Sequence, residues 1–493
     1  MKTKSPFFLA LLLLLSISAE SHHHHHHHQH PNCNAAADRS STLQVFHIFS
    51  PCSPFRPSKP LSWADNVLQM QAKDQARLQF LSSLVARKSV APIASARQLI
   101  QSPTFVVRAK IGTPAQTLLM ALDTSNDAAW IPCSGCVGCP STTVFSSDKS
   151  SSFRPLPCRS PQCNQVPTSV LFQINFEFLL LLFFQLTNSR AKQLLPNSTY
   201  RIIKHRTLTA RDPFVYQVPN PSCSSSACGF NLTYGSSTVA ADLVQDNITL
   251  ANDSVPAYTF GCITKATGSS VPPQGLLGLG RGPLSLLGQS QSLYRSTFSY
   301  CLPSFKSTGF SGSLRLGPVA QPKRIKYTPL LRNPRRSSLY YVNLIAIRVG
   351  RRIVDIPPSA LAFNSATGAG TIIDSGTTFT RLVAPAYTAV RNEFRRRIGN
   401  ATISSLGGFD TCYTVPIISP TITFMFAGMN VTLPPDNFLL HSSAGTTTCL
   451  AMAAAPDNVN SVLNVIASMQ QQNHRILFDI PNSRIGVARE PCS

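Results

Sequence analysis

Two short stretches of the sequence place an aspartate directly after an apolar run and before small hydroxylated residues. The first contains Asp123-Thr124-Ser125, and the second contains Asp374-Ser375-Gly376. Two carboxyl groups held about 3 Å apart cannot both ionise, so they share a proton and titrate as a coupled pair. One carboxylate can then act as a base toward a bound water while the other donates to a substrate carbonyl. We therefore predict that Asp123 and Asp374 are the two halves of one hydrolytic site.

The segments around both aspartates are short β-branched and aromatic runs, separated by Gly, Pro, Ser and Asn turns. Such a rhythm is typical of strands, so the body of the protein is expected to be mostly β. The two halves of the sequence also contain similar motifs. "LLMALDTS" matches "GTIIDSGT", and each half has a later apolar turn, "GLLGLG" at 275–280 and "NVIASMQ" at 464–470. We predict two similar lobes, an N-terminal lobe over 101–318 and a C-terminal lobe over 319–493.

The glycines Gly278, Gly280 and Gly282 have the spacing of a nucleotide-binding loop. That motif must open a helix within a βαβ unit, and the surrounding sequence does not provide one. A structural turn is the favoured interpretation.

With Trp130 and Tyr234, the two aspartate triplets resemble those of the pepsin family of aspartic proteases. "YTPLLRNP", "FSYCLPS", "FDTCY" and "MQQQNHRILFDIPNSRIGVA" are similar to the plant nepenthesin-like branch of that family. The resemblance covers nearly all of 104–493 and implies an all-β, bilobal pepsin-like fold with the active-site cleft between the lobes. It also implies an aspartic endopeptidase that binds a polypeptide substrate and requires no metal or organic cofactor.

The resemblance assigns a role to each residue near the two aspartates. The hydroxyls of Thr124 and Ser375 would form hydrogen bonds inside the strand turns and hold the carboxylates coplanar. Tyr234 falls at the tyrosine of the flap that closes over the substrate, and the Trp130 indole would donate to its phenol. The remaining expected support residues are Ser125, Gly376 and Thr377.

Three positions depart from the family's commoner pattern. Ser125-Asn126 follows the first Asp-Thr, Ala467 stands where the supporting turn of the second lobe usually has Gly, and the flap reads "YGSST". The alternative function is therefore a catalytically weak pepsin-like protein that binds and inhibits a secreted cell-wall hydrolase.

The chain begins with a short basic region, "MKTKS", and an apolar run, "PFFLALLLLLSIS". This predicts a signal peptide over 1–21, since the run is short for a membrane anchor. The tract His22–His28 resembles a purification tag or metal-binding run in a disposable stretch. A prosegment is expected over 22–100, with one helix in "SWADNVLQMQAKDQARLQFLSSLVARK". We expect its cations to occupy the acidic cleft at neutral pH and to leave as the carboxylates protonate.

Fourteen cysteines suit an oxidising export route, so disulfide bonds are expected. The triplet Cys133, Cys136 and Cys139 has no accompanying His, which disfavours a zinc site. Six sequons predict a glycoprotein, at Asn197, Asn231, Asn247, Asn252, Asn400 and Asn430. The expected location is extracellular, in the apoplast or cell wall, with vacuole or plastid as alternatives.

The formal net charge of +23 is spread along the chain and is not interleaved with aromatic residues. This pattern excludes a nucleic-acid surface of the usual kind and suits polyanions such as acidic wall polysaccharide. The expected protein is a monomer without a stable membrane anchor.

A Phe- and Leu-rich segment between Cys163 and Cys223 matches neither the strand rhythm nor the family. Gln-Val-Pro at 165–167 recurs at 217–219, 52 residues later. We therefore suspect a retained intron over Val166 to Gln217. A chain lacking these residues is expected to be secreted at least as well and to be fully active, because the segment would expose an apolar patch. Transcripts that all contain these codons would refute the hypothesis.

Overall fold

A computed structural model of the protein describes residues 41–85, 105–166 and 221–492, with short gaps inside each range. The expected signal peptide, the histidine tract and the suspected insert, apart from Val166, lie outside the described residues.

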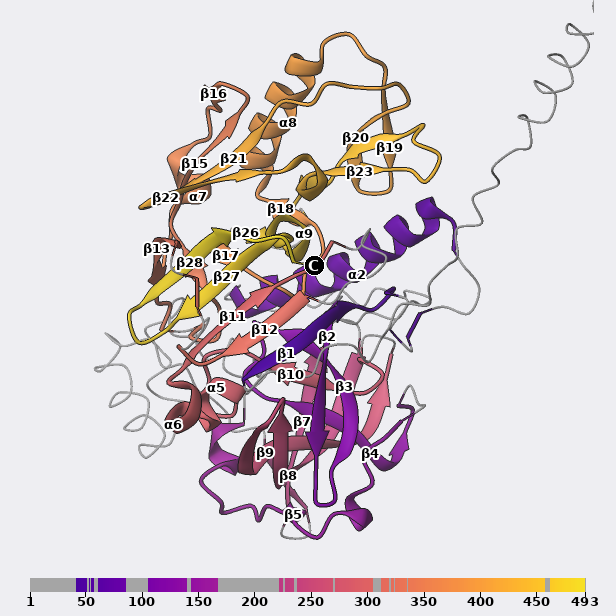
Figure 1. Ribbon diagram of the computed structural model, residues 1–493, viewed down its shortest axis with the longest axis vertical. Coiled ribbons are helices and arrows are strands. Elements are labelled where there is room, and N and C mark those ends of the chain that lie inside the picture. The colour runs from indigo at the N-terminus through magenta and orange to yellow at the C-terminus, as the bar shows by residue number, and fades with distance from the viewer. Residues whose placement is uncertain are drawn as a thin grey trace, which may run out of the picture. The chain divides into compact units, whose positions relative to one another are not determined.

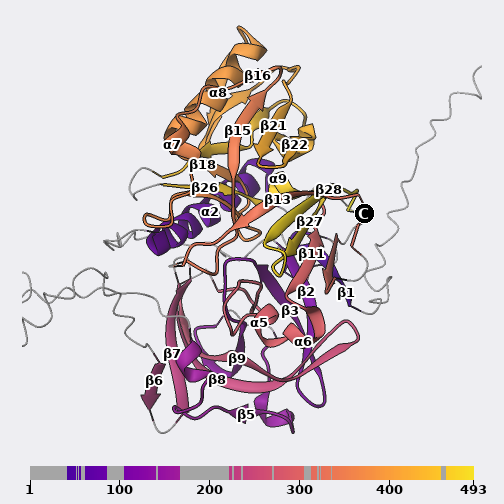
Figure 2. The ribbon, with the colours of Figure 1, turned by 90° about the vertical axis from the view of Figure 1, so that its left-hand side faces the viewer.

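The body is mostly β, as the strand rhythm predicts. Its first half contains the strands β2 (Phe105–Ile111), β3 (Gln116–Asp123), β4 (Trp130–Val137), β5 (Arg154–Pro155), β6 (Pro221–Ser224), β7 (Ala227–Tyr234), β8 (Ser237–Leu250), β9 (Asp253–Thr267), β10 (Leu276–Gly278), β11 (Thr297–Cys301) and β12 (Gly312–Leu316). The long hairpin β8–β9 continues the antiparallel pairing of β7 with β8 (Figure 2).

The second half contains one strand ladder that joins the first half and two separate four-stranded sheets. Its strands are β13 (Lys326–Leu331), β14 (Tyr341–Val342), β15 (Leu344–Val349), β16 (Arg352–Ile353), β17 (Gly370–Ile373), β18 (Thr380–Leu382), β19 (Ile403–Leu406), β20 (Phe409–Tyr413), β21 (Ile422–Phe426), β22 (Met429–Leu433), β23 (Leu439–His441), β24 (Thr448–Leu450), β25 (Met452–Ala454), β26 (Leu463–Ile466), β27 (His474–Asp479) and β28 (Arg484–Arg489).

Helices are few and mostly short. They are α2 (Trp63–Val85), α5 (Leu286–Gln289), α6 (Gln291–Tyr294), α7 (Pro358–Leu361), α8 (Ala384–Ile398) and α9 (Ser468–Gln471). In α8, Tyr387, Val390 and Phe394 are buried at three- and four-residue spacing, and this face packs on β15 and β18 (Figure 1). None of the helices in the described part of the chain combines the length and apolar character needed to cross a membrane.

The similar motifs in the two halves of the sequence correspond to a repeated strand arrangement. β3, which ends at Asp123, pairs in parallel with β10, and β17, which precedes Asp374, pairs in parallel with β26. The Asp123 carbonyl accepts from the Leu279 amide, while the Asp374 amide donates to the Ile466 carbonyl. Each aspartate is therefore fixed at the end of a buried strand by the later apolar turn of its own half.

The segment expected to be a prosegment contributes a strand as well as the predicted helix. β1 (Thr42–His47) pairs antiparallel with both β2 and β12, so this segment completes a sheet of the body (Figure 1). The sequence prediction missed β1, which is only six residues long. Helix α2 begins after Ser62, whose Oγ accepts from the Asp65 amide as an N-terminal cap.

Five disulfide bonds join described cysteines, which confirms the expectation of an oxidised protein. They are Cys133–Cys262, Cys136–Cys139, Cys163–Cys228, Cys301–Cys492 and Cys412–Cys449. All three members of the cysteine triplet are thus in disulfides, so their thiolates are not available for zinc.

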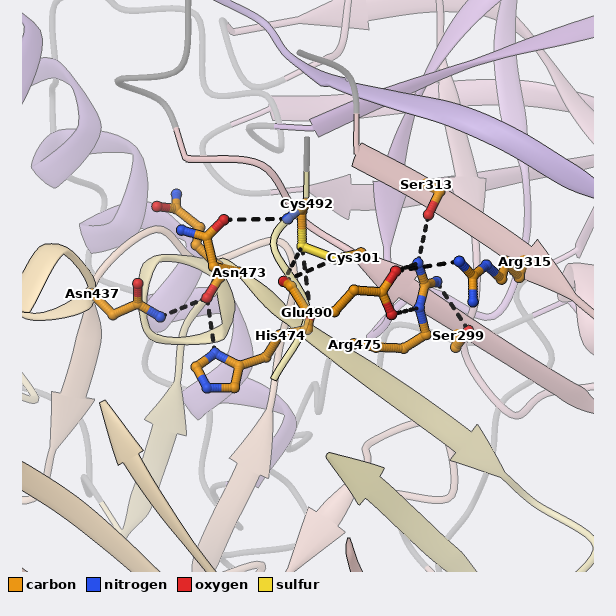
Figure 3. The surroundings of a disulfide bond; sticks show 11 residues. Ser299, Cys301, Ser313, Arg315, Asn437, Asn473, His474, Arg475, Glu490 and Cys492 are labelled. Atoms are coloured by element: carbon orange, nitrogen blue, oxygen red, sulfur yellow. Dashed lines mark hydrogen bonds and ion pairs between the residues drawn. A yellow bond between two sulfur atoms is a disulfide. The ribbon is translucent and has the colours of Figure 1, made fainter. Parts of the chain in front are cut away.

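The end of the chain is tied to the shared strand ladder near Cys301–Cys492 (Figure 3). Arg475 is fully buried, and its Nε and Nη2 donate to the Glu490 carboxylate at 2.7 and 2.6 Å. Its other contacts are the hydroxyls of Ser299, at 3.2 Å, and Ser313, at 2.6 Å. Because β11 pairs with β27, these bonds join strands from both halves of the chain.

Candidate active site

Asp123 and Asp374 meet at one buried position, and both are 0% exposed. A single guanidinium bridges them. Arg77 Nη2 donates to Asp123 Oδ1 at 2.6 Å and to Asp374 Oδ1 at 2.8 Å. Its Nη1 donates to Asp123 Oδ2 at 2.7 Å, and its Nε donates to Asp374 Oδ2 at 2.9 Å. The two carboxylates that the sequence pairs are therefore close enough to bind the same planar group from two sides.

The turns that carry the two aspartates are linked by crossed hydrogen bonds. The Ser375 amide donates to Thr124 Oγ1 at 3.0 Å, and the Thr124 amide donates to Ser375 Oγ at 3.3 Å. These hydroxyls were expected to form hydrogen bonds inside the strand turns and to hold the carboxylates coplanar. In the structure each hydroxyl accepts from the amide of the other turn, so the two bonds fix the position of one aspartate relative to the other.

Further side chains hold each carboxylate. The Ser125 amide and hydroxyl both donate to Asp123 Oδ1, at 2.8 and 3.0 Å. The Thr377 hydroxyl donates to Asp374 Oδ2 at 2.6 Å. A Cβ at Gly376 would lie 2.4 Å from the Arg77 guanidinium, so only glycine leaves room for a group bound between the carboxylates. Ser125, Thr377 and Gly376 thus all lie at the site.

Tyr234 and Trp130 also lie at the site, but the prediction that the Trp130 indole donates a hydrogen bond to the Tyr234 hydroxyl is wrong. The two rings meet edge to face with centroids 5.1 Å apart. The Trp130 indole nitrogen is buried without a hydrogen-bond partner among the described residues. The Tyr234 hydroxyl donates instead to Asp123 Oδ2 at 3.1 Å and accepts from Arg77 Nη1 at 3.3 Å. The ion pair at the carboxylates attracts the phenol more strongly than a neutral indole N–H does.

The charges at the site perturb one another. Burial raises the pKa of Asp123, but the adjacent Arg77 guanidinium outweighs burial and leaves this pKa below its usual value. Burial lowers the pKa of Arg77, yet Asp123 and Asp374 more than offset it, so the guanidinium stays protonated. Burial and the Asp123 charge raise the pKa of Tyr234, so its phenol stays neutral.

Helix α2 (Figure 1) supplies Arg77, which bonds Asp123 at the end of β3 and Asp374 directly after β17. Asp74, one turn earlier, accepts from the amides of Thr378 and Phe379 at 2.6 and 2.7 Å. Gln71, one turn earlier still, donates to the Leu406 carbonyl and accepts from the Gly408 amide. One face of the helix is therefore bound to two parts of the second half, the segment just after Asp374 and the turn between β19 and β20.

Sequence reasoning placed prosegment cations in the cleft without identifying Arg77, and it missed Asp74 and Gln71. Their spacing was an available signal. In a helix, positions 71, 74 and 77 lie on one face. On a face that is otherwise buried, polar residues at this spacing indicate bound partners.

Two glycines and one alanine define the turns behind the aspartates. A Cβ at Gly278 would lie 2.4 Å from the Ala128 carbonyl oxygen, and one at Gly280 would lie 2.5 Å from that of Asn126. These glycines therefore form a structural turn, as predicted, and not a nucleotide loop. Ala467 is fully buried with φ −89°, a conformation that any residue adopts, so the departure from glycine introduces no backbone strain.

The described residues contain no group of three His, Cys, Asp or Glu side chains that could hold a metal ion. The arrangement instead allows both carboxylates to form hydrogen bonds with one small polar group. With the guanidinium absent, that group can be a water molecule.

Comparisons with known proteins find similar family models, relatives and solved structures. The family model described as xylanase inhibitor N-terminal matches residues 105–175 and 184–318, and the C-terminal model matches 339–489. "Aspartyl protease AED3" of Arabidopsis thaliana is 47% identical over 467 residues, which is 93% of each chain. "Aspartyl protease 25" of Oryza sativa subsp. japonica is 44% identical, over 92% of this chain and 94% of that one. "Aspartic proteinase nepenthesin-1" of Nepenthes gracilis is 30% identical, over 79% and 78%.

Solved structures share the fold at lower identity. Basic 7S globulin from soybean has a TM-score of 0.56 and 19% identity, covering 78% of this chain and 93% of that one. Conglutin gamma, a basic 7S globulin from lupine seeds, has a TM-score of 0.55 and 20% identity, covering 78% and 90%.

Proposed function

Because this chain belongs to the plant aspartyl proteases that have pepsin-like, xylanase-inhibitor-type domains, we propose that it is an aspartic endopeptidase made as a zymogen. The observation that carries this proposal is the guanidinium of Arg77 bound between Asp123 and Asp374. A group that bonds both carboxylates occupies the position that a catalytic water would need.

In the proposed reaction, a water replaces the guanidinium and bonds both carboxylates. The ionised carboxylate accepts a proton from the water as its oxygen attacks the scissile carbonyl, and the protonated one donates to the carbonyl oxygen. No covalent intermediate forms. Thr124 and Ser375 keep the carboxylates together, while Ser125 and Thr377 bias the proton by donating to one oxygen of each. Tyr234 covers the site and excludes bulk water.

The zymogen part of the proposal assigns inhibition to residues 22–100. Arg77 neutralises the carboxylates and blocks the water, while β1 and α2 anchor the segment on the body. Removal of this segment exposes the cleft, in which an extended polypeptide then binds.

We propose that the protein works outside the cell, in the apoplast or cell wall, as a monomeric glycoprotein. The apolar start of the chain, the disulfide bonds and the sequons support this location.

Hydrolysis of a denatured protein at acid pH tests the proposed function. We expect cleavage that a statine-type inhibitor blocks, since such inhibitors bind the carboxylate pair. The alternative, a weakly active protein that inhibits a cell-wall hydrolase, is favoured by the name of the matching family model. Inhibition of a xylanase without proteolysis would establish that alternative and refute the endopeptidase.

A further inference from the structure

Two buried tyrosines cross between the halves of the chain and bond the segments that hold the two aspartates. Tyr300 of β11 is 0% exposed, and Tyr340, directly before β14, is 1% exposed. Both rings pack on Phe478 of β27, with ring centroids 5.4 and 4.5 Å away. Burial raises the pKa of both phenols, so each hydroxyl stays a neutral donor. The close packing of the rings fixes the direction in which each hydroxyl donates.

Tyr300 supports Asp374 through Gln471 of α9. The Tyr300 hydroxyl donates to Gln471 Oε1. Gln471 Nε2 donates to the Asp374 carbonyl at 3.1 Å and to the Ile466 carbonyl at 2.8 Å, and this second carbonyl also accepts from the Asp374 amide. Gln471 thus uses its oxygen and both of its N–H groups. A phenol of the first half therefore holds the side chain that fixes the backbone of Asp374 in the second half.

Tyr340 supports Asp123 in the reciprocal way. Its hydroxyl donates to the Leu279 carbonyl at 2.6 Å, and the Leu279 amide donates to the Asp123 carbonyl at 2.8 Å. The carbonyl of Tyr340 also accepts at 3.1 Å from the amide of Ile373, the residue before Asp374. Tyr340 therefore links the strand that carries one aspartate to the turn that holds the other.

We propose that Tyr300 and Tyr340 are positioning residues that set the spacing of the Asp123 and Asp374 carboxyl groups for hydrolysis. The inference rests on the proposed endopeptidase function and adds to the crossed hydrogen bonds between the two turns. Two carboxyl groups share a proton only while they stay close, and a misplacement of about 1 Å can lower a rate by about 10²-fold. A purely structural role would instead contribute to stability and leave each folded active site unchanged.

The first test compares acid-processed wild-type enzyme with Tyr300→Phe and Tyr340→Phe on a fluorogenic peptide. Titration with a statine-type inhibitor counts the folded sites in each sample. Phenylalanine keeps the ring on Phe478 and removes only the hydroxyl. We expect kcat per site to fall about tenfold and KM to change less than about twofold, because the spacing of the carboxyl groups matters most in the transition state. The Ki of the inhibitor should rise about as much as kcat falls, since the inhibitor bonds both carboxyl groups.

The pH profile of kcat/KM gives a second measure of the spacing. A pair that is active with one shared proton has a bell-shaped profile. Looser spacing weakens the coupling of the two carboxyl groups, so the lower apparent pKa should rise and the upper one should fall. In each Tyr→Phe variant, both limbs should move inward by about half a pH unit or more.

Tyr387→Phe is the matched control. Its hydroxyl also donates to a partner in the fold, the Asp410 carboxylate, but neither residue belongs to the segments that hold the two aspartates. The substitution should lower Tm and leave kcat per site, Ki and the width of the pH profile at their wild-type values.

Gln471→Met tests the route from Tyr300 to Asp374 and does not depend on the folding of the tyrosine variants. Methionine has a similar length but provides neither the acceptor nor the two donors. This variant should lose at least as much kcat as Tyr300→Phe does. The double variant Tyr300→Phe/Gln471→Met should be no slower than Gln471→Met alone, because Tyr300 acts on Asp374 through Gln471.

The outcomes separate the two proposals. Wild-type kcat per site, Ki and pH profile in Tyr300→Phe and Tyr340→Phe would overturn the positioning role and leave the endopeptidase standing. A loss confined to Tm or to the number of folded sites would also overturn it. Independent, multiplied losses in the double variant would overturn the route through Gln471. Failure of the wild-type enzyme to cleave any peptide would refute the endopeptidase and the positioning role with it.

Discussion

Asp123→Asn and Asp374→Asn should each lower kcat/KM for peptide hydrolysis by at least about 10³-fold in the processed enzyme. Asparagine keeps the shape of the side chain but can neither share the proton nor accept one from water. Both turns should stay in place, because the crossed bonds between Thr124 and Ser375 do not involve the carboxylates. The measurement is the initial rate on a fluorogenic peptide, with circular dichroism to verify folding.

Asp355→Asn is the matched control, because Asp355 is exposed in the C-terminal half. It should leave the rate unchanged. Substantial hydrolysis by a folded, purified variant at either member of the pair would contradict the mechanism.

Arg77→Gln should make the carboxylate pair of the unprocessed protein accessible to ligands. The substitution removes four charge-assisted hydrogen bonds to the two carboxylates, from Nε, Nη1 and Nη2. Each such bond contributes roughly 1.5–3 kcal/mol, so the fraction of unprocessed protein that binds a statine-type inhibitor should rise by at least about tenfold. Inhibitor binding to the full chain measures this fraction. Gln75→Ala, at an exposed position of the same helix, should have no effect. An Arg77 variant as closed as the wild type would show that other contacts hold the segment.

Release of the segment should depend on pH, and two carboxylates act in opposite directions. The Asp123 pKa is lowered while Arg77 is bound, so the closed form binds fewer protons at this group than the open form does. Acid therefore favours opening through Asp123. Burial raises the Asp74 pKa to about 6, so the closed form takes up a proton there as pH falls through 6, which favours closure. Opening should consequently start only in the range of the free carboxylate pair, at roughly pH 4 to 5.

The fold was predictable because its signals are local and repeated. The strand runs around Asp123 and Asp374 appear as β3 and β17, and the later apolar turns appear beside them. Motifs that resemble pepsin-like proteases supplied the family, which the comparisons confirm. The strand β1 was missed because its six residues are stabilised by pairing with β2 and β12, contacts that are distant in the sequence.

The candidate site was predictable at its aspartates and less so at their partners. Thr124 and Ser375 bond across the two turns, and Tyr234 bonds to Asp123 in place of Trp130. These choices depend on which groups approach from other parts of the chain. Arg77 decides the last of them. The spacing of Gln71, Asp74 and Arg77 indicates that this face of α2 has bound partners, but it does not identify the two aspartates as those partners.

Titration of active sites with a tight-binding statine-type inhibitor tests the central claim most directly. We expect the full chain at pH 7 to bind almost no inhibitor, because Arg77 occupies the carboxylate pair. After incubation at acid pH and processing, the same sample should bind one inhibitor per chain and gain proteolytic activity in proportion. Stoichiometric binding before acid treatment would contradict the closed site, and activity that appears without inhibitor binding would contradict catalysis by Asp123 and Asp374.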